Sequence, residues 1–231
     1  MTTGARTGGE ATLGRLLEGV TWYKQAAFRW RLAGLVIYVD PWGLAGDLPQ
    51  ADLVLVTHAH FDHFSKEDIQ RVSGRRTTFV APHDVARELS GEVKPVRPGD
   101  RIEAAGVKLR VVPAYNVVEG RRNFHPKKNN WVGYVAEFGG QTYYHAGDTD
   151  HLPELETVRA DAAFLPIGGT YTMDVGEAAA LAKRISPRVA VPMHFGFVQG
   201  VGRASDGERF QRDASPVAVE VLTPLVPFAN R

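Results

Sequence analysis

Three histidines and an aspartate stand close together directly after an apolar run: His58, His60, Asp62 and His63. In an extended chain, the side chains at 58 and 60 point to the same side and can share one ion. Asp62 and His63 come where the chain turns, so they can serve a second ion. Neutral imidazoles and carboxylates are ligands of hydrolytic zinc, manganese or iron. The alternative interpretation is a polar loop that happens to be rich in histidine.

Two distant segments offer the ligands that this cluster lacks. Gly147 and Asp148 follow an apolar run, and the glycine lets the backbone turn close to an ion while Asp148 can bridge two ions. His194 likewise comes just after an apolar run. Loops at strand ends are the usual place for functional side chains. Taken singly, these residues could also be an ordinary turn aspartate and a surface histidine.

A pair of ions would supply hydrolytic chemistry without a serine or cysteine nucleophile. Water held between two ions that share Asp148 would have its pKa lowered towards neutrality and could attack as hydroxide. Asp62 could orient that water or take its proton. The leaving group also needs a proton, and the candidates are Tyr115, Tyr171 and His145. His145 could instead hydrogen-bond a ligand carboxylate or pack at the end of a strand.

Composition narrows the classes of function. The chain of 231 residues has 27 Lys+Arg against 26 Asp+Glu, so its formal charge of +1 favours neither nucleic acid nor an anionic membrane as a partner. It has no cysteine, which excludes disulfides and thiolate ligands. No segment is apolar over the length needed to cross a bilayer. We expect a cytoplasmic protein with a small-molecule substrate, and homo-oligomers stay open.

The apolar patterns predict strands that first run together and then alternate with helices. Predicted strands cover residues 28–32, 35–39, 53–56, 78–81, 93–96, 102–104, 107–112, 131–138, 142–145, 162–166, 189–191 and 217–222. Predicted helices start at Ser65 and cover 84–89, 175–185 and 206–212, and residues 113–130 are irregular. We expect a disordered tail over residues 1–12 and a single domain over 13–231.

Together the motifs resemble the metallo-β-lactamase superfamily, whose signature is His-x-His-x-Asp-His followed by a His, a Gly-Asp and a final His on later loops. The resemblance runs from about Val20 to Gly196. It implies an α/β fold with four layers, the αβ/βα sandwich of two mixed β-sheets flanked by helices. It also implies two divalent ions, with zinc expected and manganese or iron as alternatives.

Four segments are similar to the small, stand-alone metal-dependent hydrolases related to ascorbate-6-phosphate lactonase, and more distantly to N-acyl-phosphatidylethanolamine phospholipase D: Ile37–Trp42, Tyr144–Asp150, Leu165–Met173 and Pro192–Gly196. This resemblance implies hydrolysis of a small ester, lactone or phosphoester. The alternatives are a phosphodiesterase or nuclease, an iron enzyme of oxygen chemistry and a non-catalytic metal-binding protein. The superfamily hosts many reactions on one fold, so the substrate stays open.

The sequence departs from the superfamily pattern at one metal ligand. Relatives usually have a histidine where this chain has Tyr115-Asn116. We hypothesise that His125, in the same long loop, replaces it and completes a three-histidine set with His58 and His60. In the competing interpretation Asn116 or water fills that place, although imidazole is the better ligand.

Other residues near the motifs carry weaker predictions. Gln25 could support the metal ligands, but Lys24 stands before it where relatives often have glycine. We expect a turn or capping role for His83 and a surface position for His151. The loop cations Arg121, Arg122, Lys127 and Lys128 would hang near the mouth of the pocket if His125 is a ligand, which favours an anionic substrate. Alternatively, they are ordinary solvated charges.

Overall fold

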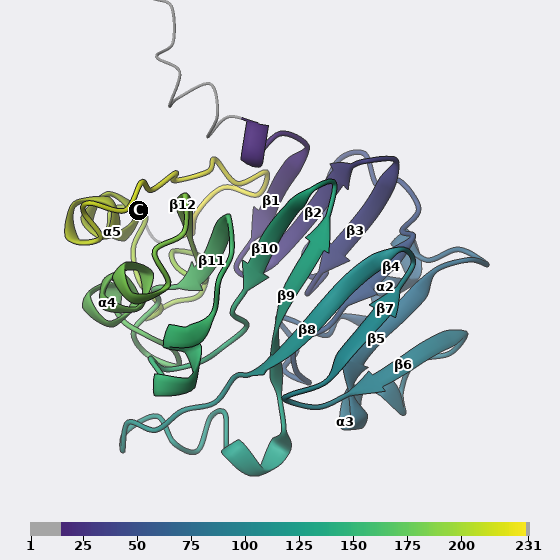
Figure 1. The fold of residues 1–231 in the computed structure, drawn as a ribbon, viewed down its shortest axis with the longest axis horizontal. Helices are drawn as coiled ribbons and strands as arrows, with labels where there is room; N and C mark the ends of the chain where they lie inside the picture. Colours follow the sequence, from purple (N-terminus) through teal and green to yellow (C-terminus); the bar gives the residue numbers. More distant parts are fainter. Residues whose placement is uncertain (1–14, 230–231) are drawn as a thin grey trace, which may run out of the picture.

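The computed structural model describes residues 15–229 and contains two six-stranded β-sheets that face each other (Figure 1). The first sheet has the order β1 (Val20–Lys24), β2 (Ala27–Leu32), β3 (Leu35–Val39), β4 (Leu53–Leu55), β5 (Thr78–Pro82) and β6 (Glu92–Val96). The second has the order β12 (Val189–Met193), β11 (Ala162–Pro166), β10 (Gln141–His145), β9 (Val132–Phe138), β8 (Val107–Pro113) and β7 (Arg101–Ala104).

Besides the helical residues Arg15 and Leu16, the described chain contains four α-helices and two short 3-10 helices: α2 (Lys66–Val72), α3 (His83–Ala86), α4 (Val175–Ile185), α5 (Asp206–Asp213), η1 (Lys127–Asn129) and η2 (Pro153–Thr157). Figure 1 shows α4 and α5 beside β11 and β12, whereas α2 and α3 lie by the first sheet. The predicted tail, residues 1–12, lies outside the described residues.

Both sheets are mixed. In the first, β1, β2 and β3 are antiparallel, and β3 to β6 are parallel. In the second, β7 to β10 are antiparallel, and β10 to β12 are parallel. The predicted sandwich of two mixed sheets flanked by helices is thereby confirmed.

Aromatic and aliphatic side chains fill the space between the sheets. Phe28 and Trp30 of β2 contact Phe164 of β11, with ring centroids 4.9 and 5.1 Å apart. Because alternate residues of a strand point to one face, the spacing of these two rings places both in the core. The Tyr134 hydroxyl of β9 donates to the carbonyl oxygens of Val56 (2.8 Å) and Val80 (3.2 Å), so it ties the two sheets together.

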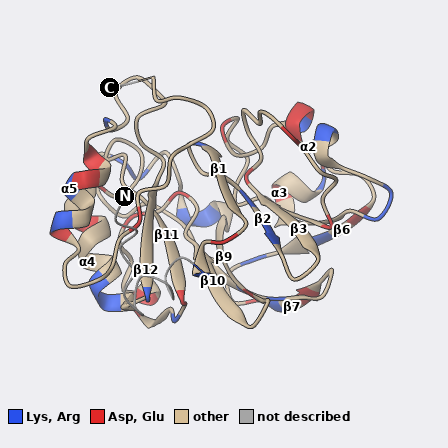
Figure 2. Ribbon diagram, turned by 90° about the horizontal axis from the view of Figure 1, so that it is seen from above, with Lys and Arg blue, Asp and Glu red and all other residues tan. Residues whose placement is uncertain are grey.

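The helices begin at polar residues that the sequence supplies. Ser65 accepts a hydrogen bond from the backbone N–H of Asp68 at 3.2 Å, as their spacing predicted for the start of α2. Asp174 and Glu177 form a reciprocal capping box at the start of α4. Figure 2 shows charged residues along α4 and α5 and none within β11 or β12, which fits strands buried on both faces.

The structure differs from the sequence prediction at three elements. Residues 20–24 form the edge strand β1, which the sequence analysis did not predict. The predicted last strand, 217–222, is reduced to one isolated bridge between Val219 and Ala190. The helix predicted over 84–89 ends at Ala86 and continues only as turns. Among residues 15–229, no helix is long and apolar enough to cross a membrane.

Several strands from both sheets end at the same edge of the sandwich. Because β1 and β3 are both antiparallel to β2, they run in one direction, and β4 runs parallel to β3. By the same reasoning β8, β10 and β12 share a direction in the second sheet. The segments that follow these strands carry the predicted ligands. All of these segments therefore begin at the carboxyl ends of strands that run in the same direction within their sheet.

Gly133, in β9, lies where backbone segments pack closely at this edge. A Cβ at this position would lie 2.7 Å from the carbonyl oxygen of Ala146 and 2.8 Å from that of His145. We predict that Gly133→Ala lowers the free energy of unfolding by about 1 to 3 kcal/mol, because backbone atoms have to move. Urea unfolding measures this. Gly120→Ala, where a Cβ meets nothing within 4 Å, is the control, and equal effects would contradict the prediction.

Candidate metal centre

The first group of ligands consists of His58, His60 and His125. One ring nitrogen from each lies within 4.8 Å of the other two. His58 Nε2 and His60 Nδ1 are 3.1 Å apart. His58 and His125 are buried, and the ring of Trp131 packs against all three imidazoles at centroid distances of 4.9 to 5.7 Å. The structure thus places His125, rather than Asn116, beside the two histidines of the motif.

The second group of ligands consists of Asp62, His63 and His194, whose ligand atoms also lie within 4.8 Å of one another. Asp62 Oδ2 is 3.8 Å from His63 Nε2 and 3.6 Å from His194 Nε2. His194 adopts a positive φ of 59° directly after β12, which turns its ring towards the other ligands.

Asp148 lies between the two groups. Its Oδ2 is 3.3 Å from His125 Nε2 in the first group and 3.0 Å from His194 Nε2 in the second. Its Oδ1 is 3.4 Å from His63 Nε2. The preceding Gly147 has a φ of 63°, and a Cβ there would lie 2.8 Å from the Val132 carbonyl oxygen. Only glycine therefore allows the turn that brings Asp148 in.

The donor atoms fit divalent metal ions. His63 Nε2, His125 Nε2 and Asp148 Oδ1 are buried and have no hydrogen-bond partner among the described residues. Buried polar atoms are otherwise almost always satisfied. The donor separations of 3.0 to 3.9 Å bracket roughly 3.4 Å, the edge of a tetrahedron with metal–ligand bonds of about 2.0–2.1 Å. These clusters could therefore bind metal ions.

Mutual attraction sets the charges of the second group. Burial alone would raise the pKa of the Asp148 carboxyl, but His194 and His63 outweigh it and hold that pKa well below its usual range. Burial alone would lower the pKa of His194, but Asp148 and Asp62 raise it to about 9. The same carboxylates raise the pKa of His63 against its burial. In the metal-free protein, protons therefore occupy places that cations would take.

Two imidazoles of the first group, those of His58 and His60, are neutral instead. Burial, with further repulsion from His63, lowers the pKa of His58 well below its ordinary value. Burial and the neighbouring His125 lower the pKa of His60 to about 4. Neutral imidazole is the form that binds a metal ion, so these two rings need lose no proton at pH 7.

Asp40 orients two of the ligand histidines, and the sequence analysis did not assign it to the site. Its Oδ2 accepts from His63 Nδ1 at 2.7 Å and from the Thr57 hydroxyl at 2.7 Å. The Thr57 oxygen in turn lies 2.9 Å from His58 Nδ1. Carboxylates that hold the far nitrogen of a ligand histidine fix its ring and its tautomer. The signal in the sequence was an aspartate directly after the strand of residues 35–39.

Asn116 orients His125. Its Oδ1 accepts hydrogen bonds from His125 Nδ1 at 2.7 Å and from the His125 backbone N–H at 3.1 Å. Its Nδ2 donates to Asp150 Oδ1 at 2.8 Å and to the Tyr171 carbonyl oxygen at 3.0 Å, which fixes the direction of the amide. With Nδ1 donating, the lone pair of His125 Nε2 faces the other ligands. Asn116 thus supports the histidine that takes the place of the usual ligand.

Gln25 contacts the second group, as the sequence analysis suggested. Its Nε2 lies 3.2 Å from Asp62 Oδ2 and 3.2 Å from His194 Nε2. Its backbone carbonyl accepts the N–H of His194 at 3.0 Å, and its φ of 48° makes this turn. The Nζ of Lys24 lies 3.8 Å above the ring of Trp42.

Comparison with known proteins agrees with the metal-binding chemistry that the site indicates. A model of the β-lactamase superfamily domain matches residues 19–194. A metal-dependent hydrolase of Thermoplasma acidophilum is 34% identical over 183 residues, which cover 76% of this chain and 78% of the relative. The chain belongs to the metallo-β-lactamase superfamily. It is a metal-dependent hydrolase.

Solved structures of the superfamily show the same fold. A provisionally named metal-dependent hydrolase from Parabacteroides distasonis superposes with a TM-score of 0.77 at 31% identity, covering 87% of this chain and 91% of that one. A metallo hydrolase from the archaeon Ignicoccus hospitalis superposes with a TM-score of 0.74 at 26% identity, covering 89% and 94%.

Two of the three candidate proton donors, His145 and Tyr115, are not among the side chains that line the cavity above the ligands. His145 is buried between the sheets, where its Nε2 donates to the Ala26 carbonyl oxygen at 2.9 Å. This position favours the alternative interpretation, in which His145 packs at the end of a strand. Tyr115 donates its hydroxyl to Glu154 at 2.7 Å. Tyr171 does line the cavity above the ligands.

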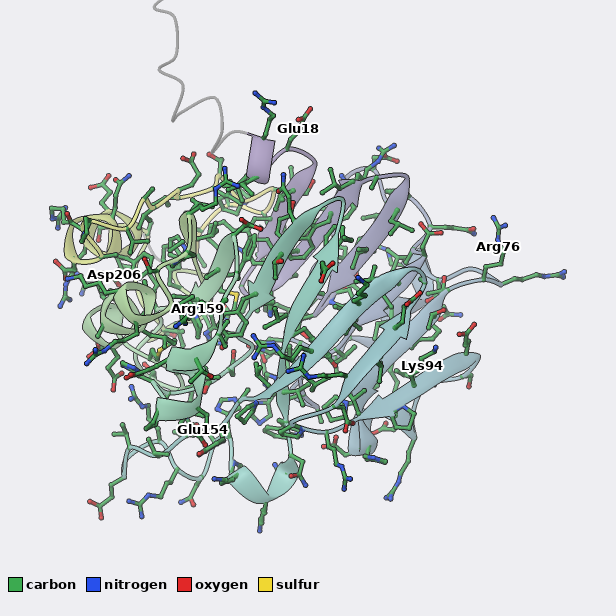
Figure 3. All side chains as sticks on the ribbon, viewed as in Figure 1. Glu18, Arg76, Lys94, Glu154, Arg159 and Asp206 are labelled. Atoms are coloured by element: carbon green, nitrogen blue, oxygen red, sulfur yellow. The ribbon has the colours of Figure 1, made fainter. Side chains whose placement is uncertain are left out.

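The loop cations do not gather at the cavity as expected. Arg121 is only 8% exposed, lies 2.9 Å from Asp150 and forms two hydrogen bonds with Glu177. Arg122 donates to the carbonyl oxygen of Val117, and Lys127 contacts the hydroxyl of Tyr115 and lies 3.8 Å from Glu154, which Figure 3 labels. The expectation that these cations surround the pocket is wrong for Arg121.

The remaining two histidines stay outside the site. His83 is exposed and is the first residue of α3. His151 lies 3.0 Å from Glu156. Neither belongs to a group of candidate metal ligands among the described residues.

We predict that Asn116→Ala weakens the first metal group selectively. Without the amide oxygen, the His125 ring can rotate and its Nδ1–H loses its partner, so affinity for the ion should fall by about 10- to 100-fold. Isothermal titration calorimetry with stepwise addition of metal measures the affinity of each of the two groups for its ion. Asn123→Ala, an exposed residue of the same loop, is the control. Unchanged affinity in Asn116→Ala would remove Asn116 from this role.

We also predict that metal uptake releases protons. At pH 7.5 the raised pKa values keep His63 and His194 protonated in the metal-free protein, so ions must displace about two protons. Calorimetry in buffers of different ionisation enthalpy counts them. The protonated His194 stabilises the metal-free protein fully below about pH 6.5, and this stabilisation is lost as the pH rises through about 9. The Tm of the metal-free protein should therefore fall over that interval. Proton-neutral uptake would contradict the pKa assignments.

Proposed function

We propose that this hydrolase uses two divalent ions, with zinc as the native metal, to hydrolyse a small ester, lactone or phosphoester. The observation that carries the proposal is Asp148, whose Oδ2 lies 3.3 Å from a donor of the first group and 3.0 Å from a donor of the second. A carboxylate in that position can serve both groups. The all-nitrogen-and-oxygen donor set suits zinc, and manganese and iron are the alternatives.

His58, His60 and His125 would hold one ion, and Asp62, His63 and His194 the other, with Asp148 shared. Divalent ions in such a site lower the pKa of bound water to near neutrality and polarise a carbonyl or phosphoryl oxygen. The side chains that line the cavity above them can then act on the substrate. Its floor includes His60, Asp62 and Asp148.

Asp62 is the residue best suited to accept or direct the proton of the attacking water. Burial alone would raise the pKa of its carboxyl, but His63 and His194 keep that pKa far below the ordinary value, so the carboxylate is ionised. Gln25 Nε2 donates to its Oδ2 and holds its orientation. An oriented carboxylate within reach of water can accept or direct a proton. Tyr171, on the wall of the cavity, is the remaining candidate for proton transfer to the leaving group.

The proposal predicts a specific loss of activity. Asp62→Asn in the metal-loaded protein should lower kcat by about 100-fold or more on any ester, lactone or phosphoester that the wild type hydrolyses. His151→Ala, outside the site, is the matched control and should retain wild-type kcat. Turnover in a substrate panel and elemental analysis of each variant are measured together. Full activity of Asp62→Asn, or of protein stripped by a chelator, would contradict the proposal.

His125→Ala gives a second test of the same arrangement. Removing one of three imidazoles should leave less than two bound ions per chain, with the first group depleted. Elemental analysis after dialysis against a metal buffer measures the content. Two ions bound at wild-type affinity would exclude His125 from the ligands.

A further inference from the structure

The cavity above the ligands has two kinds of lining. Its volume is about 240 Å³. Six polar side chains belong to the candidate centre or contact it: Gln25, His60, Asp62, His125, Asp148 and His194. The other five are aromatic or aliphatic: Phe61, Phe124, Tyr171, Val198 and Val201. A reactive centre therefore opens onto a wall that offers apolar contact.

Phe61 and Phe124 are the exposed aromatic residues of this wall, and each is paired with a second aromatic ring. Phe61, 70% exposed, stands edge-on to Trp42 with ring centroids 5.7 Å apart. Phe124, 39% exposed, stands edge-on to Tyr171 at 4.6 Å. Large apolar side chains held at the surface beside a cavity indicate a binding surface. The first pair comes from segments after β3 and β4, and the second from segments after β8 and β11, so both sheets contribute to the wall.

Phe124 is fixed by the same loop that supplies a ligand. It directly precedes His125, whose backbone N–H and ring are both held by Asn116. The Asn116 amide also donates to the carbonyl oxygen of Tyr171, the ring partner of Phe124. The distance between the apolar wall and the metal ligands is therefore set by one hydrogen-bonded unit.

Lysine and arginine are missing from the described lining of this cavity. The nearby Arg121 is engaged by Asp150 and Glu177, and the Lys24 ammonium lies over Trp42. An anionic group remote from the reacting bond would lose its water and meet no lysine or arginine among the lining side chains, which is unfavourable.

We propose that the substrate of this site is an uncharged carboxylic ester or lactone whose small apolar body contacts Phe61, Phe124 and Tyr171, an inference that rests on the proposed hydrolytic function. Water adds its oxygen to the carbonyl carbon, the bond from that carbon to the alcohol oxygen breaks, and that oxygen takes up a proton from the water. An ester gives an acid and an alcohol, and a lactone gives one hydroxy acid. At about 30 Å³ per water, the cavity holds roughly eight water volumes, which fits one ring or a short chain.

Matched esters separate charge from size. The metal-loaded protein is assayed on phenyl acetate, on its para-sulfonated analogue, on methyl acetate and on phenyl phosphate. Phenyl acetate should have a kcat/KM at least about tenfold above the sulfonated ester. The sulfonate makes the phenol a better leaving group, so this order cannot arise from leaving-group chemistry. Equal or faster turnover of the sulfonated ester or of phenyl phosphate would overturn the inference.

Variants of the wall test its role. Phe124→Ala and Phe61→Ala should each lower kcat/KM on phenyl acetate by about tenfold and leave methyl acetate, which lacks the ring, within about twofold. Phe124→Lys should bring the sulfonated ester closer to phenyl acetate. Leu225→Ala, at an exposed apolar residue outside the cavity, is the control and should change none of these values. Equal losses on phenyl and methyl acetate would contradict the role of the wall.

A binding measurement separates failure of this inference from failure of the hydrolytic function. Benzyl alcohol and its para-sulfonated analogue are titrated into the metal-loaded protein by calorimetry, which requires no turnover. Weaker binding of the sulfonated compound, removed by Phe124→Lys, supports the uncharged pocket. Equal or tighter binding of the sulfonated compound refutes it. If no ester, lactone or phosphoester is hydrolysed, the proposed function fails, whatever the binding order.

Discussion

The buried carboxylate of Asp148 is the feature around which the site is arranged. Four imidazoles lie within 3.9 Å of its oxygens, and its side chain is almost inaccessible. An isolated buried carboxylate would destabilise the fold by several kcal/mol, so it requires compensating charge. Protons on His63 and His194 provide that charge in the metal-free protein, and cations can replace them. The arrangement that makes the apoprotein stable is thus also a metal-binding arrangement.

The fold makes this crowding possible by bringing strand ends of two sheets to one edge. Tyr134 and His145 both lie in the second sheet and donate to backbone carbonyls of the first, at Val56, Val80 and Ala26. These bonds fix the relative position of the segments that carry the ligands. The loop of residues 113–130 adds His125 and Phe124, so it contributes both to the metal centre and to the apolar wall.

Local sequence patterns predicted the parts of the site that lie within one short segment. The spacing of His58, His60 and Asp62, and the Gly147-Asp148 turn, indicate ligands without any knowledge of the fold. His145 is buried beside Tyr143 and Tyr144 of the same strand, as in the alternative interpretation that the sequence left open. The two mixed sheets followed from the superfamily resemblance, whereas their strand order was not predicted. The prediction of a strand over residues 217–222 was wrong, because within this segment only Val219 forms a β-bridge, to Ala190.

Residues that act through another residue were the hardest to predict. Asp40 and Asn116 reach the ligands only because segments far apart in sequence meet, and neither forms a local motif with the histidine it holds. The role of Arg121 depends on Glu177, 56 positions later in the chain. A charged loop therefore indicates a binding surface only when its partners in the fold are known.

The most direct test of the shared carboxylate is anomalous diffraction at the zinc edge from crystals of zinc-reconstituted protein. The account predicts two peaks, one among His58, His60 and His125 and the other among Asp62, His63 and His194, each within bonding distance of Asp148. A single peak, or two peaks of which one lies away from Asp148, would contradict it.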